Sequence, residues 1–168
     1  RTTRAAAAEA LQHIGFAVSS WSRRQKSLAG VNSFAGLDEL DEFLAASDIL
    51  VCLLPLTPDT EGIVNSRTLK ALPEGACLIN GARGGLVVEA DVIAALESGR
   101  LAHAVLDVTC EEPLPADNTL WRAPNITITP HVASITNAGS CAGLVADNIR
   151  RVRAGEAPQS LVDPTAGY

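Results

Sequence analysis

The chain has 168 residues, a length typical of one domain. Apolar residues make up 47% of it, which is enough to build a core, and charged residues make up 19%, which is too few for a disordered tail. Its 13 Lys and Arg residues against 19 Asp and Glu residues give a net charge of -6. This balance argues against a nucleic-acid partner, because phosphate binding needs a clustered positive field.

No segment has the pattern of a membrane span or an export signal. The longest apolar runs, such as residues 49–54, are too short to cross a bilayer, and no basic stretch followed by an apolar run opens the chain. We therefore predict a cytoplasmic protein without a membrane partner. The sequence contains no Met and begins at Arg1, so we expect it to be a piece of a longer protein.

The cysteines predict neither a metal site nor a disulfide framework. They form no CxxC pair and have no nearby His at zinc-ligand spacing. Two of them stand inside apolar runs, where a free thiol behaves as a small apolar side chain. We therefore predict reduced, structural thiols at Cys52, Cys77, Cys110 and Cys141.

Short apolar runs alternate with helical patterns along the chain. In order, the patterns predict a helix over 4–13 that Gly15 ends, a strand over 16–21, a helix with Leu37, Leu40, Phe43 and Leu44 on one face, a strand over 49–54, a helix over 66–72, a strand over 76–80, a helix over 89–98, a strand over 102–108, a Pro-rich loop over 111–124, a strand over 126–129 and a helix over 137–153. Apolar strands separated by helices favour an α/β fold with a doubly wound parallel sheet. Ligands of such folds bind beyond the carboxyl ends of the strands, so the residues found there are the candidates for function.

The first strand is followed by Ser22, Arg23 and Arg24. A dinucleotide-binding fold that prefers NAD usually has an acidic residue here, which accepts hydrogen bonds from the ribose 2'-hydroxyl. A hydroxyl and two guanidinium groups suit a 2'-phosphate instead. A solvated basic turn is an equally good interpretation of these three residues alone.

The next strand ends in a rigid loop that carries hydroxyl groups. Leu54 and Pro55 lead into Thr57 and Thr60. This loop is suited to line the ribose and nicotinamide side of a cofactor, although by itself it is only a turn signal.

Arg83 stands between glycines after the strand over 76–80. Gly81 and Ala82 precede it, and Gly84 and Gly85 follow it. Such an Arg is exposed, has little packing to do, and can hold a carboxylate in a bidentate fork. The alternative is a surface Arg in a flexible turn.

Two later strands end near acid and base side chains. Asp107 ends one strand with Glu112 shortly after it, and His131 follows the next strand. A lone His is more often structural than catalytic. Here a carboxylate and a His follow successive strands close to an exposed Arg, which is a plausible acid/base arrangement.

Taken in order, four segments resemble the D-isomer-specific 2-hydroxyacid dehydrogenase family. They are Leu54–Thr60, Leu78–Gly85, Leu106–Val108 with Glu112–Pro115, and Thr129–Ala133. Within that family, Trp21–Arg23, Leu120–Trp121 and residues 162–168 look most like the glyoxylate/hydroxypyruvate reductase A branch.

The resemblance implies a reductase of small 2-oxoacids, with glyoxylate and hydroxypyruvate as substrates. His131 would donate a proton to the forming alkoxide, and Glu112 would hold the His tautomer so that a proton is available near neutrality. Arg83 would bind the substrate carboxylate and polarise the carbonyl.

The resemblance also implies the cofactor contacts. Asp107 matches the acidic residue that orients the nicotinamide carboxamide, and the implied donor is NADP(H) in preference to NAD(H). The implied cofactor-binding residues are Ser22, Arg23, Arg24, Leu54, Pro55, Thr60, Gly81, Ala82, Asp107 and Ala133.

The chain departs from the family pattern at its start. Family members carry a strand and a G-x-G-x-x-G loop immediately before the helix that matches residues 4–13, whereas Arg1–Arg4 stands in that place here. We therefore expect a Rossmann-like domain over 1–154 that lacks the first strand and the Gly-rich loop. The tail over 155–168 is expected to return toward a substrate lobe.

Two functional hypotheses follow. In the first, the chain is part of a reductase whose catalytic residues are intact, and the isolated chain has weak or no turnover because nothing anchors the cofactor pyrophosphate. In the second, it is a non-catalytic remnant or interaction module whose sheet is completed by a partner chain. The family also implies a homodimer formed largely through this domain.

Overall fold

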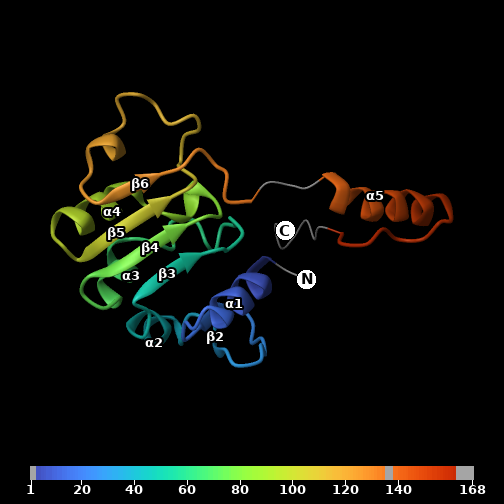
Figure 1. Ribbon diagram of the computed structural model, residues 1–168, viewed down its shortest axis with the longest axis horizontal. Helices are drawn as coiled ribbons and strands as arrows, with labels where there is room; N and C mark the ends of the chain where they lie inside the picture. The colour runs from blue at the N-terminus through green and yellow to red at the C-terminus, as the bar shows by residue number, and fades with distance from the viewer. Residues whose placement is uncertain (1–2, 135–137, 162–168) are drawn as a thin grey trace.

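The computed structural model describes residues 3–134 and 138–161, in which helices alternate with parallel strands (Figure 1). The elements in chain order are α1 (Thr3–His13), β1 (Ser19–Ser22), β2 (Asn32–Ala35), α2 (Leu40–Ala45), β3 (Ile49–Cys52), α3 (Ser66–Ala71), β4 (Ala76–Asn80), the 3-10 turn η1 (Gly84–Leu86), α4 (Glu89–Glu97), β5 (Leu101–Leu106), the 3-10 turn η2 (Thr119–Arg122), β6 (Ile126–Ile128) and α5 (Ala138–Arg153). The predicted α/β class is confirmed.

The strands form two separate parallel sheets. β1 pairs with β2, and the other four strands pair in the order β3-β4-β5-β6. Within the described residues no strand lies between β1 and β3. This gap is where the missing first strand of a Rossmann-like sheet would lie, since that strand occupies the middle of the order 3-2-1-4-5-6. The parallel pairing of the described strands agrees with the predicted Rossmann-like fold.

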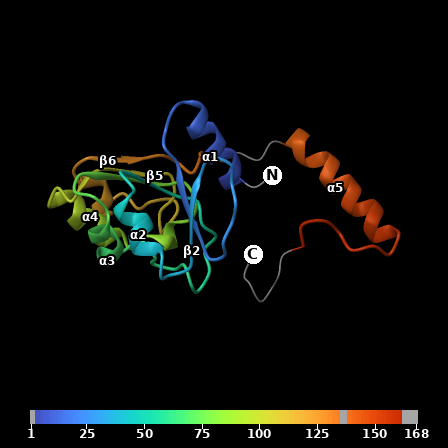
Figure 2. The ribbon, with the colours of Figure 1, turned by 90° about the horizontal axis from the view of Figure 1, so that it is seen from below.

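Helices lie on both sides of the sheets. α2, α3 and α4 lie on one side, and α1 lies on the other (Figure 2). The core is built mainly from leucines of the four-stranded sheet and of the helices and turns packed against it, while Ile49 and Val51 of β3 are exposed. The fully buried leucines are Leu69, Leu72, Leu78, Leu86, Leu101, Leu106 and Leu120.

Local sequence signals set several element boundaries. Asn65 caps α3: its side chain accepts hydrogen bonds from the backbone N–H groups of Arg67 and Thr68, and the Thr68 hydroxyl accepts one from the Asn65 N–H in return. Gly15 follows α1 with φ of 96°, a conformation that residues with a Cβ rarely adopt. The predicted ends of these helices are therefore close to the observed ones.

The region around β2 differs from expectation. The pattern Asn32–Ala35 has one large apolar residue and predicted no strand, yet it forms β2 by pairing with β1. Leu37, expected on the buried face of a helix, is 73% exposed, because the helix begins only at Leu40. β1 itself begins at Ser19 rather than at residue 16. These short strands depend on their pairing and not on an apolar run.

The last helix lies apart from the sheets in Figure 1. Apolar side chains of α5 are exposed, including Val145 at 55% and Val152 at 59%. Its final turn contains Arg150, Arg151 and Arg153, as expected for cations at the negative end of a helix dipole. Residue 137, where the sequence placed the helix start, and residues 162–168 of the tail lie outside the described residues.

All four cysteines are free thiols, as predicted, and Cys52 is buried. Among the helices that the structure describes, none has the length and apolar character needed to cross a membrane.

Candidate active site

The buried Asn80 side chain shapes the loop that follows β4. Its Oδ1 accepts a hydrogen bond from Ala82 N at 3.2 Å, and its Nδ2 donates to the Arg83 carbonyl at 3.0 Å. The exposed Arg83 side chain donates from Nη1 to the Ala82 carbonyl at 2.6 Å. A guanidinium held at the carboxyl edge of the sheet has further N–H groups to offer a carboxylate.

Gly84 brings the Arg83 turn into contact with the loop that carries Glu112. A Cβ added at Gly84 would lie 2.0 Å from the Thr109 carbonyl oxygen and 2.5 Å from Cys110 N, so no side chain fits at this position. The same loop is also held by α4, because Cys110 N donates to Oε1 of Glu89, the first residue of that helix, at 2.7 Å. The positions of Arg83 and Glu112 are therefore coupled through backbone contact.

His131 and Glu112 form a hydrogen-bonded pair. The distance from His131 Nδ1 to Glu112 Oε2 is 2.8 Å, and Thr109 N donates to Glu112 Oε1 at 3.1 Å. The hydrogen bond with His131, followed by the one from Thr109 N, lowers the pKa of Glu112 below its usual range. Because an ionised carboxylate can only accept, Nδ1 of His131 carries the hydrogen and Nε2 is directed to other partners. Both side chains are half-exposed, which leaves the pair open to a ligand.

Asp107 holds the backbone around His131. Its Oδ1 accepts from Val132 N at 2.9 Å and its Oδ2 accepts from Ala133 N at 2.8 Å, while the Thr129 hydroxyl also donates to Oδ1. The Asp107 carbonyl accepts from His131 N at 2.9 Å. His131 has φ of 54°, in the left-handed region that costs energy for a residue with a Cβ, and these bonds stabilise it there.

The ionisation of Asp107 follows from the same contacts. Burial of the side chain opposes its charge, but the hydrogen bonds from Thr129, Ala133 and Val132 outweigh that effect and lower the pKa of Asp107. Asp107 is therefore a carboxylate at neutral pH whose oxygens already accept three hydrogen bonds.

Cys110 is unsuited to nucleophilic catalysis. Desolvation, followed by the negative charge of Glu89, raises the pKa of the Cys110 thiol to about 11. The thiol is protonated at neutral pH, whereas the nucleophilic form is the thiolate. The chemistry of this edge of the sheet therefore rests on the His, the carboxylates and the Arg.

Apart from the residues around His131, a pocket lies at the carboxyl ends of β1 and β3. It is lined by Trp21, Ser22, Arg23, Arg24, Lys26, Gly36, Leu37, Leu54, Pro55, Thr57, Asp59 and Thr60. Three cationic side chains face one carboxylate, and Arg23 Nη1 lies 3.8 Å from Asp59 Oδ2. The excess of positive charge gives this pocket the character of an anion site.

Thr60 organises the loop after β3. Its hydroxyl donates to the Pro55 carbonyl at 2.7 Å and accepts from Thr57 N at 2.8 Å. The loop that lines one wall of the pocket is thus closed on itself by a single side chain.

The structure gathers the predicted residues into two groups. One group surrounds the His–Glu pair and contains Gly81, Ala82, Arg83, Asp107, Glu112, His131 and Ala133, with Ala133 directly beside Gly81. The other lines the basic pocket and contains Ser22, Arg23, Arg24, Leu54, Pro55 and Thr60.

Several residues that build these sites were missed by sequence reasoning. Lys26 extends the basic cluster after β1 and was visible as a third cation two residues beyond Arg24. Asn80 was visible as an Asn-Gly turn signal. The contacts of Gly84 and Glu89 with the loop after β5 had no signal in the sequence, because they join segments far apart in the chain.

Comparison with known families gives one match that spans most of the chain. The sequence model described as D-isomer specific 2-hydroxyacid dehydrogenase, NAD binding domain, matches residues 4–133.

Solved structures agree with this match. The chain is 51% identical to a D-isomer specific 2-hydroxyacid dehydrogenase from Xanthobacter autotrophicus Py2, solved with NADPH, with a TM-score of 0.94; the match covers 98% of this chain and 68% of that one. It is 40% identical to the NADPH-dependent glyoxylate/hydroxypyruvate reductase of Sinorhizobium meliloti, solved with NADP and sulfate, with a TM-score of 0.91. That match covers 97% of this chain and 53% of the reductase, so the chain spans between half and about two thirds of these relatives.

Proposed function

The chain belongs to the D-isomer specific 2-hydroxyacid dehydrogenase family, and from this premise we propose that it serves the reduction of a small 2-oxoacid, glyoxylate or hydroxypyruvate, to the 2-hydroxyacid. The observation that carries the proposal is the His131–Glu112 pair at 2.8 Å, beside the exposed Arg83. The reductase of Sinorhizobium meliloti, similar over nearly the whole chain, supports the substrate class.

The three side chains take complementary roles in this proposal. His131 donates a proton from Nε2 to the oxygen of the reacting carbonyl, while Glu112 accepts from Nδ1–H and holds the orientation of the ring. Arg83 holds the substrate carboxylate and stabilises the negative charge that develops on the oxygen. Asp107 positions the loop that carries His131 through its bonds to Val132 N and Ala133 N.

The residues fit an NADP(H) cofactor. Ser22, Arg23, Arg24 and Lys26 offer one hydroxyl and three cations to a 2'-phosphate, and Leu54, Pro55 and Thr60 line the same pocket. Gly81, Ala82, Asp107 and Ala133 would lie on the nicotinamide side. When bound, this cofactor supplies the hydride. Structures of two relatives with NADPH or NADP support the preference for NADP(H) over NAD(H).

The proposed organisation of the protein follows the family. Residues 1–154 form part of the dinucleotide-binding domain, residues 155–168 lead toward a substrate lobe, and the assembly is a cytoplasmic homodimer. We propose that residues 1–168 alone have weak or no turnover, because the helix at 3–13 is not preceded by a G-x-G-x-x-G loop to bind the pyrophosphate.

The test compares two proteins. One is residues 1–168, and the other is a chimera in which these residues replace the matching segment of the Xanthobacter dehydrogenase. NADPH oxidation with glyoxylate is expected for the chimera and not for the isolated chain. An inactive but folded chimera would contradict the proposed function, and robust turnover by residues 1–168 would contradict the proposed weakness.

A second candidate function is an interaction module whose sheet is completed by a partner chain. The separation of the strands into two sheets, with β1 and β3 unpaired on facing sides, favours it.

A further inference from the structure

Asn80 is a polar residue at a position of β4 whose pattern calls for an apolar one. Ala76 and Leu78 precede it on the buried face of the strand, and the exposure of Asn80 itself is 0%. A buried amide costs free energy unless its oxygen and its nitrogen both find hydrogen-bond partners. The place of Asn80 in the core is therefore explained by the contacts that it makes and not by packing.

The Asn80 amide spans the turn that carries Arg83. Its Oδ1 accepts from Ala82 N at 3.2 Å and its Nδ2 donates to the Arg83 carbonyl at 3.0 Å. These two groups belong to the peptide units before and after the peptide that joins Ala82 to Arg83. The carbonyl of that middle peptide accepts a hydrogen bond from Arg83 Nη1 at 2.6 Å. Asn80 therefore fixes the peptide unit on which the guanidinium is anchored.

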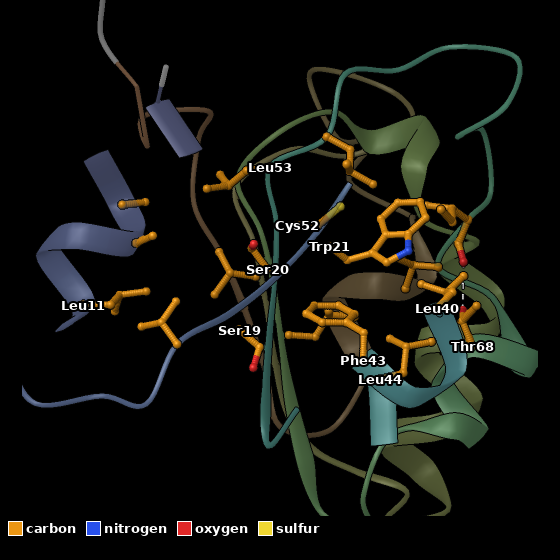
Figure 3. A pocket seen from close by; sticks show the side chains of 18 residues that line it. Leu11, Ser19, Ser20, Trp21, Leu40, Phe43, Leu44, Cys52, Leu53 and Thr68 are labelled. Atoms are coloured by element: carbon orange, nitrogen blue, oxygen red, sulfur yellow. Dashed lines mark hydrogen bonds between the residues drawn. The ribbon is translucent and has the colours of Figure 1, made fainter. Parts of the chain in front are cut away.

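Neighbouring strands hold the base of the turn in place. Asn80 pairs in register with Cys52 of β3, and Gly81 N donates to the Cys52 carbonyl at 3.4 Å. Figure 3 shows Cys52 and the next residue, Leu53, among the side chains that line the apolar groove between β1 and β3. From the end of β5, Asp107 N donates to the Asn80 carbonyl at 3.0 Å. The Asn80 backbone is thus fixed from two sides, so its side chain is a rigid support for the turn.

The direction of the Arg83 guanidinium depends on this turn. Within residues 3–134 and 138–161, the guanidinium makes one hydrogen bond, the one to the Ala82 carbonyl. The side chain is exposed, and a free Arg side chain populates many rotamers. A displacement of about 1 Å in a group that positions a substrate is enough to lower a rate by about 100-fold. A rigid anchor for the guanidinium is therefore important for any substrate that it binds.

We propose that Asn80 is a positioning residue for Arg83, whose neutral amide directs the guanidinium at the carboxylate of the substrate. The proposal rests on the proposed reductase function for the identity of that substrate, whereas the order that Asn80 imposes on Arg83 is a property of the chain itself. Asn80 is buried, so it acts only through the turn. A neutral amide is needed because the Arg83 carbonyl must meet a donor and Ala82 N an acceptor, and a carboxylate supplies acceptors only.

The kinetic test uses the chimera with the Xanthobacter dehydrogenase. Asn80→Asp replaces the donor Nδ2 by an oxygen that faces the Arg83 carbonyl, so the KM for glyoxylate above neutral pH is expected to rise by about tenfold or more. The KM for NADPH is expected to change little, because most of the proposed cofactor contacts lie in the basic pocket. Asn118→Asp is the matched control, since Asn118 offers its side-chain oxygen to Leu120 N and a carboxylate does the same.

The pH dependence separates positioning from a general loss of structure. Burial raises the pKa of the introduced carboxyl above the usual Asp value of about 3.9, and its protonated form donates to the Arg83 carbonyl as the amide does. The ratio of the KM for glyoxylate in Asn80→Asp to that in the wild-type chimera is therefore expected to fall as the pH is lowered below neutrality. Asn80→Ser has a shorter, neutral side chain that cannot span the turn, and it should raise this ratio equally at every pH.

The titratable neighbours of Asn80 do not produce this pH dependence. They are Arg83 on the turn, Asp107 after β5 and Cys52 on β3. Against the effect of burial, hydrogen bonds lower the pKa of Asp107, while burial raises the pKa of the Cys52 thiol, so neither changes its charge between neutral and mildly acidic pH. A guanidinium stays charged throughout. The titration of His131 is common to both chimeras and cancels in the ratio.

A measurement on residues 1–168 tests the positioning without turnover. The order parameter of the Arg83 Nε–H group, from nitrogen relaxation, is expected to fall by about a third in Asn80→Ser, the change from a rigid to a flexible group. Asn118→Asp should leave it unchanged. Equal order in the wild-type chain and in Asn80→Ser would overturn the proposal, whatever the chimera shows.

Two kinetic outcomes would also overturn it. One is an unchanged KM for glyoxylate in a folded Asn80→Ser chimera. The other is an equal rise of the KM for glyoxylate and the KM for NADPH, which would leave Asn80 a structural role only. If Asn80→Asp does not fold, the Ser variant and the relaxation measurement still decide. A wild-type chimera that is folded but inactive contradicts the reductase proposal, and relaxation alone then decides whether Asn80 orders Arg83.

Discussion

Nδ1 of His131 lies 2.8 Å from Oε2 of Glu112, although 19 residues separate them in the chain. Glu112 lies in the loop after β5 and His131 in the loop after β6, and these strands are parallel neighbours. The carboxyl ends of neighbouring parallel strands meet at one edge of the sheet, so the pairing of β5 with β6 brings the acid and its partner together.

Replacing His131 is expected to remove the proton donor. In the chimera with the Xanthobacter dehydrogenase, His131→Ala should lower kcat for glyoxylate by about 100-fold or more, the usual contribution of a general acid. His103→Ala is the matched control, since His103 pairs with the Thr127 hydroxyl on the surface. Steady-state kinetics measure both, and near-normal kcat in the His131 variant would remove this residue from the proposed role.

Replacing Arg23 and Arg24 together by Ala is expected to change cofactor preference. In the chimera with the Xanthobacter dehydrogenase, the KM for NADPH should rise by about tenfold or more while the KM for NADH changes little. The reason is that only NADPH carries the 2'-phosphate that these cations would bind. Arg122→Ala, an exposed Arg on η2, serves as the control for general loss of positive charge. Equal weakening of both cofactors would contradict the preference for NADP(H).

Gly84→Ala is expected to damage both stability and activity. The added Cβ would meet the Thr109 carbonyl oxygen at 2.0 Å, so the Arg83 turn and the Glu112 loop must move apart. We expect unfolding free energy to fall by about 1–3 kcal/mol in urea denaturation, as for other overpacked sites, and kcat of the chimera to fall with it.

Gly143→Ala on α5 is the control for the Gly84 variant. A Cβ at Gly143 meets nothing within 4 Å, and its position in a helix predicts a stability gain of about 0.5–1 kcal/mol. If Gly84→Ala behaved like this control, the close approach to Thr109 would not be a constraint.

Asp107→Asn is expected to destabilise the chain in a pH-dependent way. The folded state lowers the pKa of Asp107, so its stabilisation is present above the usual value of 3.8 and is lost as pH falls through the lower folded value. At pH 7 the variant should lose about 1–3 kcal/mol, because Asn has one acceptor oxygen where Asp107 has two, so either Val132 N or Ala133 N loses its acceptor.

Urea denaturation at several pH values checks the Asp107 prediction. The difference in unfolding free energy between the wild-type chain and the Asn variant should stay constant from pH 7 to about 4 and shrink as pH is lowered below the usual value of 3.8. A difference that does not shrink below that value would show that the charge of Asp107 does not stabilise the folded chain.

Much of the fold followed from local patterns. The strand over 76–80 was predicted with its observed bounds, and the helices over 4–13, 66–72 and 89–98 were predicted to within a residue or two, because apolar periodicity and Gly stops act over a few residues. The strand-end positions of Arg83, Glu112 and His131 followed from the same alternation. β2 was missed, since a strand with one large apolar residue is stable only through its partner β1.

The sequence by itself determined the alternation of strands and helices and the side chains available at the strand ends. Only the tertiary structure decided that Asp107 holds the His131 loop, that Gly84 contacts Thr109, that Lys26 joins the basic pocket and that β1 and β3 face each other across an apolar groove. The reason is physical: periodicity is a property of neighbouring residues, whereas these contacts join segments whose distance depends on how the strands pair and the helices pack.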